Sequence, residues 1–281
     1  DGNLLGGIQL SAAEPHGAAT ANYSITLRPW STILTMFSYR HAFHAGNFAD
    51  VHKHATLAWV LDYMTRKDKP LSYIETHGGR GLYDLEADEA LHTGEAAAGI
   101  EAVADWFEQS HPYAKTLADC REENGETNYP GSPWIASHML RGDDVLHVAE
   151  LHPMERSILE IIVPGVHVYG QDGFDMAYSQ CPPTPRRGLM LVDPSYEIKD
   201  DYRDIPRHMT KIAKIWPVGV LMLWYPILVD QRHRGMTRAL GNDISNAVFH
   251  EVAFPPARDG HRMVGSGMMI VNAPWGLEDE L

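Results

Sequence analysis

The stretch Gly188-Leu189-Met190-Leu191-Val192-Asp193-Pro194-Ser195-Tyr196 decides the fold, because an apolar run ends there in a polar turn. The first five residues have the length and composition of a buried β-strand. Asp193 and Pro194 then end the strand, and Tyr196 follows two residues later. An Asp-Pro turn is common on its own, so its meaning depends on the segments around it.

Strands and helices alternate along most of the chain on both sides of this stretch. Such alternation predicts an α/β fold with a mainly parallel sheet that helices cover on both faces. Ligands bind such a sheet at the carboxyl ends of its strands. The pattern predicts further strands at 71–75, 145–149, 166–169, 218–224, 248–254 and 268–272, and helices at 50–66, 154–162, 201–215 and 229–240, with a short helix after Gly173.

Residues 82–131 interrupt the alternation. Thr93 can cap an alanine-rich helix from Gly94 to Gln109, and a second helix is expected from Tyr113 to Glu123. We interpret this segment as a small helical insertion in the sheet domain.

Residues 1–35 differ in composition from the rest, since they are rich in Gly, Ala, Ser and Thr and have little periodic apolar pattern. A denser stretch begins at Met36. The sequence therefore predicts an N-terminal arm, 1–35, followed by one domain over residues 36–281.

The composition limits the classes of function. With 281 residues, 44% of them hydrophobic, the chain can bury a large core. Its net charge of -14 argues against broad coating of nucleic acid, which needs many Lys and Arg, although a local basic patch is compatible with it. The two cysteines, Cys120 and Cys181, form no CxxC pair, which favours a reducing compartment. The longest apolar stretch, 215–229, is too short to span a membrane, so a soluble cytoplasmic protein is expected.

Three other predicted strand ends also carry polar or glycine residues. Glu75 is followed by a glycine loop, residues 78–81, in which backbone can approach a ligand closely. Glu150 could bind both hydroxyls of a ribose, and Asp172 could meet an adenine amine. Taken singly, the glycine loop could equally be a tight turn, Glu150 a surface acid and Asp172 a helix N-cap. Their order along the chain, however, is the order that a nucleotide-like cofactor requires.

The fourth strand end suggests the chemistry. An exocyclic adenine amine is a poor nucleophile, because its lone pair is delocalised into the ring. The Asp193 carboxylate and the Pro194 carbonyl could accept its two hydrogens, and Tyr196 could stack on an adenine that has left its own stack. Residues 272–275, Asn-Ala-Pro-Trp, offer a similar set. They follow the last strand, so we interpret them as a structural turn away from the cofactor.

Sixteen histidines raise the question of a metal site. His41, His44, His52 and His54 are close in sequence, but their spacing is irregular and no thiolate or regular carboxylate ligand accompanies them. His52 and His54 would also point to different sides of a helix. We therefore expect no metal.

Several motifs stand together in this sequence: Phe37 to Asn47, Asp50, Lys53-His54, Thr76-His77, Pro130 to Pro133, Glu150 to Pro153, Asp172-Gly173, Asp193-Pro194 and Tyr196-Glu197. With these motifs the sequence resembles a known family, the bacterial 23S ribosomal RNA adenine-N6 methyltransferases of the RlmJ type, also described as proteins of external DNA catabolism. The resemblance covers about residues 36–275.

The resemblance implies a class I, Rossmann-like methyltransferase fold with a seven-stranded, mainly parallel sheet and a small helical subdomain. It implies an RNA-binding enzyme that uses S-adenosyl-L-methionine to methylate N6 of an adenine in 23S ribosomal RNA, acting as a monomer on free or early-assembly RNA. Asp193 would be the catalytic acceptor, with Pro194 and Tyr196 beside it, and Tyr39 and His41 would contact the RNA. The implied cofactor-binding residues are Lys53, His54, His77, Ser132, Glu150, Asp172 and Gly173.

Two alternatives stay open. A DNA adenine methyltransferase would use the same chemistry, but no target-recognition domain is recognisable in the sequence. A catalytically decayed nucleic-acid-binding protein is suggested by Ser195 and Arg80, which stand where the family usually has a second proline and a small residue. A dinucleotide-dependent oxidoreductase would share the sheet but would leave the Asp193 turn unexplained.

Overall fold

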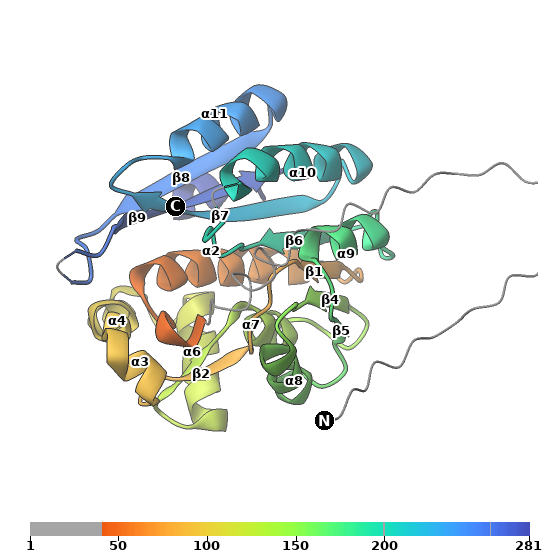
Figure 1. The fold of residues 1–281 in the computed structure, drawn as a ribbon. Helices are drawn as coiled ribbons and strands as arrows, with labels where there is room; N and C mark the ends of the chain where they lie inside the picture. Colours follow the sequence, from red (N-terminus) through yellow and green to blue (C-terminus); the bar gives the residue numbers. More distant parts are fainter. Residues whose placement is uncertain (1–40, 199, 259) are drawn as a thin grey trace, which may run out of the picture.

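The computed structural model describes residues 41–198, 200–258 and 260–281, so the predicted arm and Tyr39 lie outside the described residues. One seven-stranded sheet runs through the centre of this part of the chain, in the order β5-β4-β1-β6-β7-β9-β8 (Figure 1). The strands are β1 (Ser72–Glu75), β4 (Val145–Ala149), β5 (His167–Tyr169), β6 (Gly188–Val192), β7 (Val220–Leu228), β8 (Ala247–Ala253) and β9 (Met263–Val271).

Strand β9 is the one reversed strand of this sheet: it pairs antiparallel with β7 on one side and β8 on the other. The neighbours β5, β4, β1, β6 and β7 all pair in parallel. The predicted α/β fold with a seven-stranded, mainly parallel sheet is therefore confirmed.

Helices cover both faces of the sheet, as the alternation predicted. Side chains alternate along β6: Leu189 and Leu191 join a core with α2 (Phe48–Thr65), α6 (Pro112–Asn124) and α7 (Ser132–Met139). Met190 and Val192 point to the other face and join a core with α9 (Gly173–Gln180), α10 (Asp201–Ile215) and α11 (His233–Asp243). All five residues of β6 are buried, as two-sided coverage requires.

Local signals explain where several of these helices begin. Asn47 caps α2, because its side chain accepts a hydrogen bond from the amide of Asp50. His152 caps α8 (Pro153–Ile162) in the same way, and Pro153 supplies the preset φ of a first helical residue. Helix α10 begins at the predicted Asp201, directly after the loop that contains Asp193. No described helix is long and apolar enough to cross a membrane.

The insertion differs from the prediction in two respects. A single helix from Gly94 to Gln109 is wrong: the segment consists of α4 (Glu95–Ala98), α5 (Ile100–Val103) and the 3-10 turn η2 (Ala104–Trp106). The break falls at Gly99, where a side chain would collide with the carbonyl oxygen of Gly46. The insertion also contains a small antiparallel sheet of β2 (Leu82–Asp84) and β3 (Asn128–Pro130), besides α3 (Asp88–Thr93).

The C-terminal part needs smaller corrections. Strand β7 continues through Pro226 to Leu228, because β9 pairs with it along its whole length, and α11 therefore begins four residues later than predicted. Strand β9 begins at Met263 rather than at Met268. Residues 277–280 form a last short helix, α12.

Candidate active site

A cavity of about 330 Å³ lies at the carboxyl ends of the parallel strands, where such sheets bind ligands. It draws its walls from the loops after β1, β4, β5 and β6, from α2, and from the start of α7. The lining includes every described residue for which the sequence predicted a role: His41, Lys53, His54, His77, Ser132, Glu150, Asp172, Gly173, Asp193, Pro194 and Tyr196.

Glu150 ties the glycine loop to the end of β4. Its Oε2 accepts a hydrogen bond from the amide of Gly79 at 2.7 Å, and its Oε1 accepts one from the amide of His152 at 2.6 Å. Gly79 has a φ of +64°, a conformation that favours glycine. Burial raises the pKa of Glu150, and the neighbouring Glu155 carboxylate adds to that effect. The predicted ribose ligand is thus also a clamp between two loops.

Asp172 and Gly173 hold the start of α9 against the loop after β1. Oδ1 of Asp172 accepts hydrogen bonds from the amides of Phe174, at 2.9 Å, and Asp175, at 3.2 Å. Any side chain at Gly173 would collide with the carbonyl oxygen of Thr76. Asp172 is therefore the N-cap of α9, which was the alternative to a ligand role in the sequence analysis. It is also part of the cavity wall.

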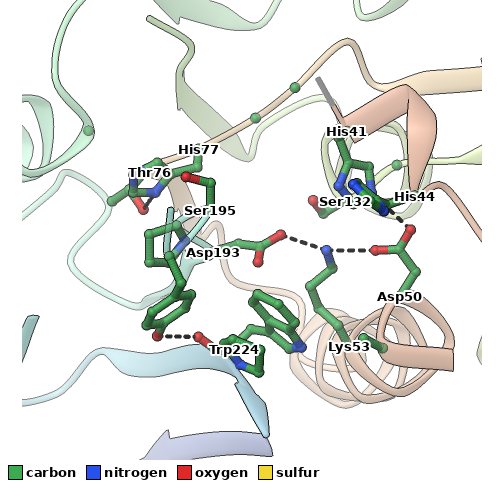
Figure 2. Close-up of a pocket in the computed structure, with 18 of the residues that line it drawn as sticks. His41, His44, Asp50, Lys53, Thr76, His77, Ser132, Asp193, Ser195 and Trp224 are labelled. Carbon is green, nitrogen blue, oxygen red and sulfur yellow. Dashed lines mark hydrogen bonds and ion pairs between the residues drawn. The ribbon is translucent and has the colours of Figure 1, made fainter. Parts of the chain in front are cut away.

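Asp193 belongs to a row of charged groups that crosses the cavity (Figure 2). Lys53 Nζ lies 2.5 Å from Oδ2 of Asp193 and 2.9 Å from Oδ1 of Asp50. Oδ2 of Asp50 in turn contacts Nε2 of His41 at 2.8 Å. Although burial lowers it, the two neighbouring carboxylates raise the pKa of Lys53 above its ordinary value. The lysine is therefore a buried cation that the Asp193 and Asp50 carboxylates share.

Tyr196 is fixed in the wall beside Asp193. Its φ is +55°, and its hydroxyl donates a hydrogen bond to the carbonyl oxygen of Trp224 at 2.7 Å. The ring packs near Tyr202 and Trp224, with centroid distances of 4.8 Å and 5.8 Å. Trp224 is itself held by Ser266, whose hydroxyl oxygen accepts from Nε1 at 2.9 Å. The loop after β6 is thus anchored to β7.

The histidines near the cavity make separate contacts. His54 is buried and its Nδ1 lies 2.9 Å from the hydroxyl of Tyr129 in β3. Nδ1 of His77 lies 2.7 Å from the hydroxyl of Thr76. Burial lowers the pKa of both imidazoles, which favours their neutral forms. His52 lies on another face of α2 and contacts His250 and Ser266. Among the described residues, no three His, Cys, Asp or Glu side chains could jointly hold a metal ion.

Sequence reasoning gave no role to Glu75, which lies under the cavity at the end of β1. Its carboxylate accepts hydrogen bonds from Ser132, at 2.5 Å, and from Tyr73, at 2.8 Å. Burial raises the pKa of Glu75 to about 8, although both hydrogen bonds oppose that rise. Asp50 and Trp224 were also missed. A signal existed for two of the three: Glu75 ends a buried apolar strand, and Asp50 stands one helical turn before Lys53.

The rival turn at 272–275 lies elsewhere. Strand β9 runs antiparallel, so its end is beside the beginning of β7, at the sheet edge opposite to Asp193. The amide nitrogen of the Asn272 side chain donates to the carbonyl oxygens of Pro217 and Gly219. These residues therefore form a turn at the far edge of the sheet.

Comparison with known proteins gives one family. The family model described as "Ribosomal RNA large subunit methyltransferase D, RlmJ" matches residues 68–281. The ribosomal RNA large subunit methyltransferase J of Escherichia coli K12 is 36% identical over 255 residues, which is 88% of this chain and 90% of that protein. The protein of the same name from Haemophilus influenzae is 36% identical over 254 residues, with the same coverage.

A solved structure agrees with these matches. The crystal structure of a Legionella pneumophila protein is 35% identical in sequence, covers 84% of this chain and 90% of that chain, and superposes with a TM-score of 0.76.

Proposed function

This chain belongs to the family of large-subunit ribosomal RNA methyltransferases J, and from that membership we propose that it methylates N6 of an adenine in 23S ribosomal RNA. The observation that carries the proposal is the position of Asp193 and Pro194. They follow the fourth strand of the parallel run and share one cavity with Glu150 and Asp172. A pair of acceptors is thereby set beside a site suited to a nucleoside.

The residues of the cavity fit S-adenosyl-L-methionine. The volume of about 330 Å³ lies within the range of small-molecule sites, roughly 300–1,000 Å³. Glu150 would hold the ribose hydroxyls and Asp172 the adenine end, while the glycine loop and Gly173 leave backbone exposed to a close ligand. His54, His77 and Ser132 would complete the pocket. When bound, the cofactor would supply the electrophilic methyl group.

The chain's own residues would act on the target amine. Asp193 and the Pro194 carbonyl would accept the two N6 hydrogens, which draws the lone pair out of the ring and toward the incoming methyl group. After transfer the nitrogen is positively charged and sheds a proton readily, and Asp193 is placed to accept it. Tyr196 would support the flipped base with its anchored ring.

Lys53 would hold the Asp193 carboxylate in this position. Its ammonium group holds one oxygen of Asp193, which leaves the second oxygen of the carboxylate for the amine. Its contact with Asp50 joins the catalytic loop to α2 and, through His41, to the segment that precedes α2. The lysine would thus position Asp193.

The direct test is methyl transfer from labelled S-adenosylmethionine to protein-free large-subunit RNA, followed by mass analysis of the modified nucleoside. N6-methyladenosine in RNA, with no transfer to duplex DNA of the same sequence, is the expected result. Transfer to DNA alone would favour a DNA adenine methyltransferase. Cofactor binding without transfer to any substrate would favour the decayed binding protein.

A further inference from the structure

The charge of this acidic chain is unevenly divided. The insertion, residues 82–131, contains 12 Asp and Glu against two basic residues, Lys115 and Arg121. Residues 186–262, which include β6, β7 and β8, contain 12 Lys and Arg against nine Asp and Glu. A polyanion is therefore repelled more strongly by the insertion than by residues 186–262.

The acids of the insertion face solvent. Most of them are exposed, including Asp84, Glu86, Asp88, Glu101, Asp105, Glu108, Glu122, Glu123 and Glu126. At physiological ionic strength such charges act over about 8 Å. RNA that lay along the insertion would meet this repulsion without a compensating cluster of cations.

Three arginines stand near the cavity mouth, and we call them the arginine lip: Arg232, Arg258 and Arg262. They lie on the loops that follow the carboxyl ends of β7 and β8. Residues within four positions of them in sequence, Leu228, His261 and Met263, line the cavity itself. The Arg258 and Arg262 side chains are 51% and 59% exposed. Figure 1 shows the β8–β9 hairpin reaching toward α4.

The lip is not neutralised by its acidic neighbours. Arg232 and Arg262 both contact Oδ2 of Asp230, at 2.5 Å and 2.6 Å, so one carboxylate serves two guanidinium groups. Arg258 lies 4.0 Å from Glu95, a buried acid that also contacts His44 and His261. Each guanidinium carries five N–H donors, and these contacts use only part of them.

We propose that the RNA strand beside the target adenine crosses the arginine lip, where Arg232, Arg258 and Arg262 bind its phosphates, and that the exposed acids of the insertion keep RNA off the insertion's outer surface. This rests on the proposed function. The base must enter the cavity, so phosphates within a nucleotide or two of it must lie over the mouth. Guanidinium groups suit phosphate oxygens in geometry as well as in charge.

The test compares charge removal at the lip with the same removal at the opposite edge of the sheet. Arg258→Gln/Arg262→Gln is the test variant, and Lys67→Gln/Lys69→Gln, whose side chains are exposed before β1, is the matched control. KM for protein-free large-subunit RNA is measured between 50 and roughly 300 mM salt. The lip variant should raise KM on the order of ten-fold and reduce the salt slope by about 1.5, with kcat and cofactor affinity unchanged. The control should stay near wild type.

Further variants separate phosphate contact from loss of structure. Arg262→Gln alone removes a side chain whose contact is Asp230, and Arg262→Lys should restore much of the RNA affinity because it keeps the charge. Glu122→Gln/Glu126→Gln on the insertion should lower KM. Equal effects of the lip and control variants would overturn the proposal, as would a lip variant that weakened cofactor binding as much as RNA binding.

Failure of the proposed function would be recognised separately. If the wild type transferred no methyl group, direct RNA binding by the same variants would still be measured with labelled RNA. Loss of that binding at the lip, and not in the control, supports the lip even then. Binding that is indifferent to both variants overturns it.

Discussion

Nζ of Lys53 lies 2.5 Å from Oδ2 of Asp193, and this ion pair joins the long helix α2 to the end of β6 across 140 residues of sequence. Both side chains are largely enclosed, with 4% and 13% of their surface exposed. Lys53 also holds Asp50. The position of the loop after β6 therefore depends on a helix that belongs to a different wall of the cavity.

Replacing Asp193 tests the enzymatic proposal. Asp193→Ala removes an acceptor aimed at the amine and should lower kcat on the order of a thousand-fold, as loss of transition-state-directed groups does. Cofactor affinity should change little, because Glu150 and Asp172 would carry that binding. Single-turnover methylation measures the rate of methyl transfer, and calorimetry measures the cofactor affinity. Normal turnover by the variant would remove Asp193 from the mechanism.

Lys53→Met should lower both activity and stability. It leaves Asp50 and Asp193 facing each other's charge without a cation, and breaking a buried ion pair from one side costs about 3–5 kcal/mol. Urea unfolding measures the loss of stability. The loss of activity is measured as kcat at a temperature where the variant is folded. The exposed Lys115→Met is the matched control. A variant with wild-type kcat would show that Asp193 needs no partner.

Glu150→Gln should weaken cofactor binding by tens-fold. The neutral amide loses charge-assisted hydrogen bonds to the ribose, worth about 2–4 kcal/mol together. Because Glu150 also accepts hydrogen bonds from Gly79 and His152, the variant should also lose about 1–2 kcal/mol of stability. Calorimetry and thermal unfolding measure the two effects, with the exposed Glu160→Gln as control. Unchanged affinity would leave Glu150 as a loop clamp only.

Glu75 should make the protein less stable as pH rises from about 4.5 to about 8. Its pKa is raised from 4.5 to about 8 by burial, so the folded chain binds a proton that the unfolded chain releases in this range. Stability contributed by that proton is complete below pH 4.5 and is lost toward pH 8. The free energy of unfolding of Glu75→Gln, measured between pH 5 and 8, should therefore rise relative to wild type by several kcal/mol. If the free energies of unfolding of wild type and Glu75→Gln changed in parallel with pH, the raised pKa of Glu75 would be contradicted.

The elements that the sequence predicted well are those with clear local ends. Strands β4 and β6 and helix α10 have the predicted bounds, because turn residues such as Asp193-Pro194 stop them sharply. The early part of β9 was missed because Gly265 and Gly267 are poor strand formers. In the sheet, Gly267 lies under the ring of Tyr225, where a side chain would not fit. Such a requirement comes from a neighbour 42 residues away and leaves no local pattern.

The candidate site was predicted residue by residue but not as a set of contacts. The order of polar strand ends placed Glu150, Asp172 and Asp193 around one cavity. Their partners could not be read from sequence, because the Lys53 and Asp193 contact joins distant segments. Glu75 was missed for a related reason: its hydrogen bond to Ser132 exists only once the insertion has folded back to the sheet.

The reversed strand β9 determines when its neighbouring strands can pair during synthesis of the chain. It lies between β7 and β8 but is synthesised after both, so β7 has an open edge and β8 has no partner in the sheet until β9 leaves the ribosome. Trp224 accepts the hydrogen bond from Tyr196, and its own side chain can bond to Ser266 only after β9 has been made. The wall beside the loop after β6 is therefore completed only after β9 has been made, and a newly made chain passes through a stage in which an unpaired strand edge needs protection from other chains.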